Sequence, residues 1–486
     1  MTDFALYTAA RIKQIERIAI EDLGLPGIVL MRRAGQAAFA ALMQRWPDAK
    51  AITVFCGGGN NGGDGYVVAR LALQAGLHVV LMALVDAGEL KGDALTSCQD
   101  FMAAGGRVQR FDGTGAIEGV VVDALLGTGL NRQVDAGYAT AINHINHSKM
   151  PVIAIDLPSG LNADTGAVMG DCVRANMTIT FIARKTGLFT GQAADMTGDV
   201  VCDDLAVPTT AFSSIEPEAH LLVPRPMAKR RRCAHKGDCG RLVLVGGNLG
   251  FSGAIRLAGE AALRGGAGLV NILTHPDHAT VLNLGRPELM CRGADESNAG
   301  QRMLAAADVL VVGPGLGLDA WAEACFQAAL DANQPGVVDA DGLNLLATKP
   351  CKRDDWILTP HPGEAARLLN CTTGDIAADR YAAVRALQSK YGGVCVLKGA
   401  GTLIADDSTI RVATVGNPGM ASGGMGDVLA GLCGALLAQG LSAFDAACLA
   451  VDTHGRAADR VAATHGEIGL LASDLLVEIP ALLNGL

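Results

Sequence analysis

Short apolar runs of strand length alternate with longer segments of helical periodicity along the whole chain. In the first half these runs occupy residues 51–56, 78–84, 119–123 and 151–156. A second series occupies residues 241–245, 309–312, 337–339, 356–359 and 394–398. Strands that alternate with helices in this way form parallel sheets covered by helices. The pattern therefore predicts an α/β fold in both halves.

The alternation weakens between residues 208 and 233, where serine, glutamate and proline precede a basic run at residues 229–232. Such a cluster indicates a connection between domains, and the basic run is typical of a solvated linker face. A chain of 486 residues also exceeds what one hydrophobic core usually supports. We predict a first domain over residues 1–213, a linker over 214–224 and a second domain over 225–486. Little residue identity links the halves, so they are not a tandem repeat.

Composition narrows the classes of protein that fit this pattern. A formal net charge of −10 argues against general nucleic-acid binding, which needs a positive field. The thirteen cysteines are scattered without zinc-site spacing, and the first ten residues lack a signal-peptide layout, so we expect reduced thiols and a cytoplasmic location. The most apolar stretch, residues 428–438, falls short of the roughly 18 to 20 residues of a membrane helix. We expect no membrane association.

A glycine-rich segment, GGGNNGGDG at residues 57–65, follows the first strand, and we expect a helix to begin near Tyr66. Backbone amides in such a turn can approach a phosphate closely. A tight turn without a ligand is the alternative. Asn60, Asn61 and Asp64 place polar oxygens where open α/β sheets bind their ligands, which favours a ligand or cation site.

Two further strands end in an aspartate, Asp123 in VVDALLGTG and Asp156 in AIDLPSG. A single aspartate in this position is often only a helix cap. Two of them beside the glycine and asparagine segment form a cluster of hard oxygen donors, which suits an alkali or alkaline-earth cation. The sequence predicts that these strand ends meet in one cleft.

The segments GGGNNGGDG, DALLGTG and DLPSGLNADTG resemble those of the NAD(P)H-hydrate epimerase family, over residues 1 to about 211. The resemblance implies a Rossmann-like three-layer α/β/α domain and a potassium ion held by Asn61, Asp123 and Ser159. It also implies a substrate site for the hydrated dinucleotide, made of Asn60, Asn61, Gly62, Gly63, Asp64, Gly127, Thr128, Gly129, Leu130, Asn131, Arg132, Gln133 and Asp156. Epimerisation needs a proton donor and acceptor, and we assign a catalytic role to Asp156. We expect Lys185 to be a surface residue and leave it out of the site.

In the second half, GNPGMASGGMGD at residues 416–427 leads directly into an apolar helix at 428–438. Free amides at such a helix start can bind an anion. Asp427 could be an ordinary helix-start residue, but within an anion site its carboxylate can take a proton from a hydroxyl during phosphoryl transfer. This combination, together with KGAGT at residues 398–402, resembles ribokinase-like enzymes and predicts a bound nucleotide.

Other strand ends point to the same cleft: GPGLG at 313–317, DADGLN at 339–344 and TPHPGE at 359–364. His361 could contact a ligand or simply hydrogen-bond a turn. Together these motifs resemble the NAD(P)H-hydrate dehydratase family from about residue 225 onward. The resemblance implies a ribokinase-like α/β domain with Mg²⁺, in which Ala254, Gly315, His361 and Asp427 contact the hydrated substrate and Lys398, Gly399, Ala400, Gly401, Thr402 and Gly426 hold the nucleotide. We expect His454 to be a packing residue.

The two resemblances together predict a bifunctional repair enzyme. Its first domain would interconvert the R and S forms of hydrated NADH and NADPH, and its second would dehydrate the S form with ADP as co-substrate, giving AMP and phosphate. Its partners would be these small molecules, with no nucleic acid or membrane, and the chain would form a homo-oligomer, for which a tetramer is one option. The alternatives are a small-molecule kinase of the ribokinase type and a non-catalytic nucleotide- or RNA-binding scaffold.

Overall fold

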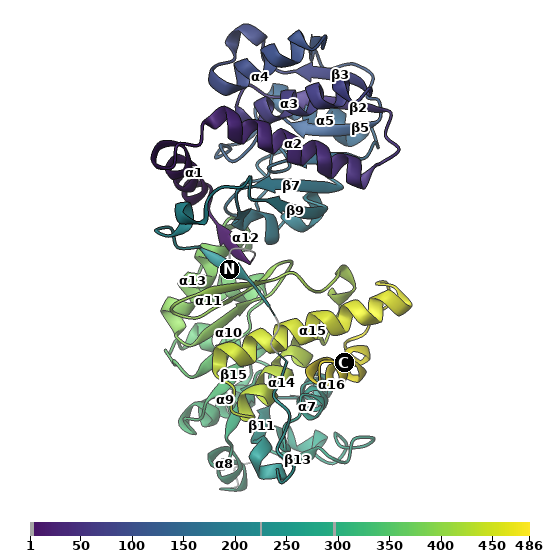
Figure 1. Cartoon of the computed structure of the whole chain (residues 1–486). Coiled ribbons are helices and arrows are strands. Elements are labelled where there is room, and N and C mark those ends of the chain that lie inside the picture. Colours follow the sequence, from purple (N-terminus) through teal and green to yellow (C-terminus); the bar gives the residue numbers. More distant parts are fainter. Residues whose placement is uncertain (1–3, 224–225, 295–297) are drawn as a thin grey trace. The chain divides into compact units, whose positions relative to one another are not determined.

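The computed structural model describes residues 4–223, 226–294 and 298–486, and the chain divides into two compact units, Met1–His220 and Leu221–Leu486 (Figure 1). The division falls within the short strand β10 (Ala219–Leu221). Residues 224 and 225, where we expected the linker to end and the second domain to begin, lie outside the described residues. The predicted domain ends therefore stay predictions.

The first unit contains a parallel sheet of seven strands in the order β4-β3-β2-β5-β6-β7-β9. In chain order they are β2 (Ala51–Cys56), β3 (His78–Ala83), β4 (Val108–Arg110), β5 (Val120–Ala124), β6 (Val152–Ile155), β7 (Met177–Phe181) and β9 (Asp199–Asp203). From β2 the chain proceeds outward in one direction to β4, and from β5 in the other direction. Ligands of open α/β sheets bind where the strand order reverses in this way. The first site is therefore expected at the carboxyl ends of β2 and β5.

Helices cover both faces of this sheet, as the predicted three-layer fold requires. On β5, Val120 and Val122 pack into one cluster with α1 (Ala9–Arg17), α2 (Gly27–Arg45), α3 (Asn60–Gln74) and α4 (Gly92–Ala103). Val121 points to the opposite face, where it packs with α5 (Ala136–His147). Successive side chains of a strand point to opposite faces, so an all-apolar strand fits between two helical layers.

Helix α3 begins at Asn60 and not near Tyr66, so most of the glycine-rich segment is the first turns of a helix rather than a loop. The glycines allow close packing. A Cβ atom on Gly63 would lie 2.6 Å from the Met31 methyl carbon, and one on Gly65 would lie 2.6 Å from the Ala124 Cβ. Both distances are too short for carbon atoms. The Met31 methyl group can move aside, but the Ala124 Cβ is fixed to the β5 backbone, so at Gly65 only glycine lets α3 approach β5 this closely. The sequence prediction was wrong because it attributed the glycines to turn geometry alone.

The second unit has a parallel sheet in the order β13-β12-β11-β14-β15-β16-β17, which antiparallel strands β18 and β19 extend. In chain order they are β11 (Arg241–Val245), β12 (Leu269–Thr274), β13 (Met290–Gly293), β14 (Val309–Val312), β15 (Gly336–Val338), β16 (Trp356–Leu358), β17 (Val394–Leu397), β18 (Thr402–Ala405) and β19 (Ile410–Ala413). The apolar runs predicted as strands in this half are all strands. Counted along each unit, the two parallel sheets have the same strand order, and the antiparallel strands β18 and β19 distinguish the second unit from the first.

One face of this second sheet is covered by α7 (Ser252–Arg264), α14 (Met425–Ala438) and α15 (Ala443–His465), which share a core with Val309 and Val311. Leu310 and Val312 point to the other face, toward α9 (Ala320–Asp331). Helix α14 lies very close to α7, because a Cβ atom on Gly431 would overlap the Ala258 backbone carbonyl. None of the helices within the described residues is both long and apolar enough to cross a membrane.

The Gly431→Ala substitution should destabilise the second unit by roughly 1–3 kcal/mol, because the new methyl group forces two helix backbones apart. Thermal unfolding followed by calorimetry measures the effect. Gly253→Ala on α7 is the matched control, since a Cβ atom there meets nothing within 4 Å. It should leave the unfolding temperature unchanged or raise it slightly, as alanine favours helices. Equal unfolding temperatures for the two variants would refute the close-packing explanation.

Two candidate active sites

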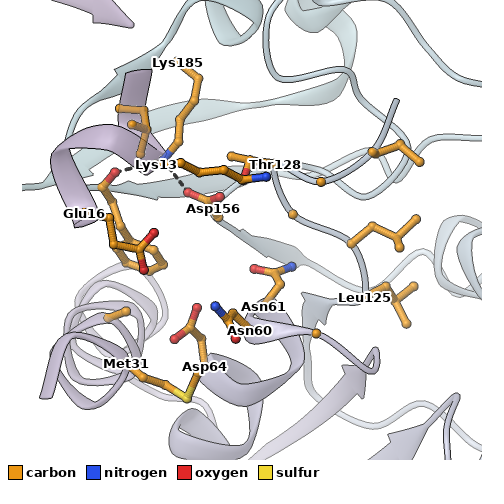
Figure 2. Close-up of a pocket in the computed structure, with 18 of the residues that line it drawn as sticks. Lys13, Glu16, Met31, Asn60, Asn61, Asp64, Leu125, Thr128, Asp156 and Lys185 are labelled. Carbon is orange, nitrogen blue, oxygen red and sulfur yellow. Dashed lines mark hydrogen bonds and ion pairs between the residues drawn. The ribbon is translucent and has the colours of Figure 1, made fainter. Parts of the chain in front are cut away.

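A cavity of about 740 Å³ lies at the carboxyl ends of β2, β5 and β6, and α1 and α2 complete its wall (Figure 2). The predicted residues that line it are Asn60, Asn61, Asp64, Gly127, Thr128, Gly129, Leu130, Asn131, Arg132, Gln133 and Asp156. Gly62 and Gly63 pack instead against Gly57 and Met31. The strand ends therefore converge on one cavity, while these two glycines serve the packing of α3.

Lys185 is buried, with only 1% of its surface exposed, and was wrongly expected at the surface. Its ammonium group donates to the Asp156 carboxylate at 2.5 Å, to the Thr180 hydroxyl at 2.8 Å and to the Phe181 carbonyl at 2.8 Å. These three acceptors use the three protons of the ammonium group. A single lysine among polar and apolar neighbours gives no sequence signal of burial. The fold alone places Lys185 in the cavity wall.

Asp156 follows β6 in the left-handed backbone region, with a φ of 67°. Aspartate tolerates this conformation better than most residues, and such outliers concentrate at functional sites. The neighbouring backbone stabilises the turn, because the Asp156 amide donates to the Ile179 carbonyl at 2.7 Å. The carboxylate is thereby held at the cavity wall against Lys185, as Figure 2 shows.

The carboxyl groups of Glu16 on α1 and Asp64 on α3 line the same cavity. Burial raises the pKa of Asp64 well above its ordinary value, and the negative charge of Asp156 raises it further. Burial and then Asp156 also raise the pKa of Glu16, against the opposing effect of Lys185. Sequence reasoning did not find Glu16, because a single charged residue on an amphipathic helix carries no motif.

Asp123 and Ser159 meet at the base of this region, as predicted. The Ser159 hydroxyl donates to one Asp123 carboxylate oxygen at 2.6 Å, and the Ser159 amide donates to the other at 2.8 Å. Burial raises the pKa of Asp123 to about 6, although these hydrogen bonds oppose the rise.

Asn61 is buried, and within the described parts of the chain neither polar atom of its amide group has a hydrogen-bond partner. Buried amides are normally satisfied, so this one indicates a bound ligand, ion or water at this position. The described residues contain no group of three or more His, Cys, Asp or Glu arranged to hold a metal ion. A cation here would take amide, hydroxyl and carbonyl oxygens as well as a carboxylate.

The second site centres on Lys398, at the end of β17. Its ammonium group lies 2.8 Å from the Asp339 carboxylate and 3.8 Å from that of Glu364. The Thr359 hydroxyl donates to the same Asp339 oxygen at 2.8 Å. A Cβ atom on Gly426 would lie 3.2 Å from the Lys398 nitrogen, so the start of α14 lies directly against this pair. The strand ends and the helix start therefore form one polar site.

Asp427 lies in the first turn of α14 beside these charges. Burial raises its pKa to about 7, Asp339 adds to the rise, and Lys398 opposes it. Helix α14 follows Gly424, which has a φ of 92° and provides no side-chain cap. The free amides of this helix start can bind an anion. A carboxylate that titrates near neutrality beside an anion site can act as a general base.

His361 is the N-cap of α11 (Pro362–Leu369), and its Nδ1 accepts hydrogen bonds from the amides of Gly363 and Glu364. Burial, and then the charge of Lys398, lower the pKa of His361. The turn hydrogen bond considered as its alternative role is therefore present. Its other ring nitrogen lies 3.3 Å from a Glu364 carboxylate oxygen.

The predicted nucleotide loop, residues 398–402, contains Gly399 and Gly401, both with positive φ. Arg380 on α13 (Arg380–Tyr391) is buried and donates to the carbonyls of Leu397 and Lys398 at 3.1 and 3.3 Å. Burial lowers the pKa of Arg380 to about 10. This guanidinium holds the backbone that leads into the loop, a role that the sequence did not reveal.

Ala254 and Gly315, two of the predicted substrate residues, are brought together, since a Cβ atom on Gly315 would lie 3.1 Å from that of Ala254. His454, expected to be a packing residue, is buried on α15. Burial lowers its pKa to about 4, which keeps the ring neutral.

Comparisons with known proteins agree with the division of the chain into two units. The family described as YjeF-related protein N-terminus matches residues 27–187, and the NAD(P)H-hydrate dehydratase family matches residues 242–481. The bifunctional NAD(P)H-hydrate repair enzyme Nnr of Coxiella burnetii is 46% identical over 485 residues, covering 99% of each chain. The chain belongs to the bifunctional NAD(P)H-hydrate repair enzymes. The Escherichia coli member of this family is 45% identical over 490 residues, covering 99% of this chain and 94% of its own.

Among solved structures, a ribokinase-like protein of Enterococcus faecalis is 30% identical with a TM-score of 0.51, covering 54% of this chain and 92% of its own. This similarity confirms the ribokinase-like fold predicted for the second half of this repair enzyme. The Rossmann-like first half follows from its own parallel sheet and the family match.

Removing the Lys185 charge should expose how strongly the first site depends on its ion pair. Lys185→Met leaves the Asp156 carboxylate without its cation and should destabilise the first unit by about 3 kcal/mol. Asp156→Asn in the same chain should restore part of that loss, because no uncompensated charge then remains. Calorimetric unfolding of both single variants and the double variant gives the coupling. Strictly additive single effects would show that the pair contributes nothing.

Proposed function

We propose that this chain repairs hydrated NADH and NADPH in two steps. The first unit interconverts the R and S epimers, and the second dehydrates the S epimer with ADP, releasing AMP and phosphate. The observation that carries the proposal is the presence of two separate polar sites of different chemistry, Asp156 with Lys185 in one unit and Asp427 with Lys398 in the other. Each lies in the unit whose family match fits it.

In the first unit, the hydrated nicotinamide would occupy the cavity with its hydroxyl-bearing ring carbon near Asp156. The loops at residues 60–64 and 127–133 would hold the rest of the dinucleotide. The unpaired Asn61 amide fits a potassium ion or a polar substrate group, and Asp123 and Ser159 would complete a potassium site. Bound potassium would supply a fixed positive charge that orients the substrate phosphates.

In the second unit, Asp427 would take the proton from the substrate hydroxyl while that oxygen attacks the terminal phosphorus of ADP. AMP leaves. The carbon–oxygen bond to phosphate then breaks, and the adjacent ring carbon gives up a proton to solvent as the ring double bond forms again. Lys398 to Thr402 and Gly426 would hold the nucleotide, with Ala254, Gly315 and His361 around the substrate. Asp339 and Glu364 present carboxylate oxygens that suit Mg²⁺, which would neutralise charge on the phosphates.

A small-molecule kinase would use the same Asp427, but it gives no role to a first unit with its own cavity and a buried ion pair. A binding scaffold gives no reason for a carboxylate that titrates near neutrality. ADP over ATP, a cytoplasmic location, the absence of nucleic-acid partners and a homo-oligomeric state stay predictions.

Each epimer supplied separately, with ADP or ATP, tests the proposal. The intact chain should restore the absorbance of reduced nicotinamide from either epimer. Asp427→Ala should abolish this recovery yet still interconvert the epimers. The Asp156→Ala variant should dehydrate the S epimer at the normal rate but should not convert the R epimer. A chain that phosphorylates small molecules but never restores the absorbance would be a kinase, and unchanged epimer ratios with no turnover would indicate a scaffold.

The dehydration rate should rise as the pH increases through about 7, the pKa of Asp427, because only the ionised carboxylate accepts a proton. Initial rates with the S epimer and ADP between pH 5.5 and 8.5 measure this dependence. Below the pKa of Asp427 the rate should change on the order of tenfold per pH unit. Asp427→Asn should lower the rate by about 10²- to 10⁴-fold and flatten the profile. A rate that falls across this interval would exclude Asp427 as the base.

A further inference from the structure

Helix α1 forms part of the wall of the first cavity, although the family match of this unit begins only at residue 27. Ile12, Glu16 and Ile20 recur at helical spacing and line the cavity together with Lys13. Ile15 on another face of the helix is fully buried. The start of α1 is fixed by the Ala9 amide, which donates to the Asp164 carboxylate at 2.6 Å. Glu16 is therefore held at the cavity by a packed helix.

Five carboxyl groups line this cavity: Glu16 from α1, Asp64 from α3, Asp93 from α4, Asp135 at the start of α5 and Asp156 from the end of β6. Figure 2 shows Glu16, Asp64 and Asp156 around the same space. The buried ammonium of Lys185 is bound to Asp156, Thr180 and Phe181, so its protons are all used. Lys13 and Arg132, the other cations that line the cavity, are exposed to solvent. Like charges in one partly desolvated cavity disfavour one another's ionised forms, so the pKa values of Glu16 and Asp64 are raised and both groups hold their protons more tightly than free carboxyl groups do.

We infer that Glu16 is the second acid–base residue of the epimerisation, acting on the face of the nicotinamide ring opposite Asp156. The inference rests on the proposed function of the first unit. The carboxyl group of Glu16 interacts with both Asp156 and Asp64 across the cavity. Asp64 is the more deeply buried of the two candidates, whereas Glu16 retains partial exposure and can exchange its proton with water.

The chemistry needs a donor on one face of the ring and an acceptor on the other. Glu16 donates its proton to the substrate hydroxyl, the carbon–oxygen bond breaks, and water leaves as the ring nitrogen forms a double bond to that carbon with its electron pair. The carbon is then planar. A water molecule adds from the other face, the nitrogen regains its electron pair, and Asp156 takes the proton released by that water. Catalysis in the reverse direction, or proton exchange with solvent, returns Glu16 to its protonated form and Asp156 to its ionised form.

The test compares Glu16→Gln, Glu16→Asp, Asp64→Asn and Glu21→Gln in the full chain, using each purified epimer. Glu21 is the matched control, because it is exposed just beyond α1 and outside the cavity lining. Glu16→Gln should lower kcat of epimerisation by about 10²- to 10⁴-fold with little change in KM. Glu16→Asp should retain part of the rate, Asp64→Asn should lose less than Glu16→Gln, and Glu21→Gln should be unaffected.

Dehydration of the S epimer by the second unit is an internal control for an intact chain, and calorimetric unfolding of the first unit reports whether each variant folds. Epimerisation in ¹⁸O-labelled water should place one labelled oxygen in each inverted product. Retention of the original oxygen, or a normal kcat in Glu16→Gln, would overturn the inference. Failure of the unsubstituted chain to epimerise at all would instead overturn the proposed function of the unit.

Discussion

A buried lysine is tolerated only where acceptors replace the water it has lost. Lys185 meets this condition through the Asp156 carboxylate, the Thr180 hydroxyl and the Phe181 carbonyl, and the arrangement of the first site depends on it. The ammonium holds Asp156 in place and compensates its charge. Asp156 still raises the pKa of Glu16 and of Asp64 by more than Lys185 lowers it. In the proposed mechanism this difference separates the proton donor from the proton acceptor.

In the second unit, which matches a different family, a lysine is likewise paired with an aspartate. Lys398 is bound to Asp339 at a strand end, and Thr359 supplies a hydroxyl to the same carboxylate. Here the pair lies against the start of α14, so the neighbouring Asp427 is poised next to free helix amides instead of a second carboxyl group across a cavity. A lysine, an aspartate and a threonine at parallel strand ends thus form the polar centre of each proposed active site.

Much of this architecture was predictable, because it depends on local signals. The apolar runs marked nine of the strands, although β7 and β12 were not predicted. Asp123 in β5 and Asp156 after β6 marked the edge where the first cavity lies. Lys185, Glu16 and Arg380 were not predictable, since each is a single charged residue whose burial arises from contacts distant in sequence. The start of α3 was misplaced for a related reason: glycine permits both a turn and a close helix contact, and only the packed neighbours distinguish them.

The glycines of α3 have an evolutionary consequence. Gly62 and Gly65 are constrained by the Gly57 backbone carbonyl and the Ala124 Cβ, whatever the cavity binds. A descendant of this chain that lost catalysis would conserve these glycines because its core requires them. Asn61 and the acidic residues of the cavity could then be substituted. Inactive relatives should therefore be recognised by substitutions at the polar positions of the cavity. An intact glycine segment in a sequence indicates only that the domain still folds.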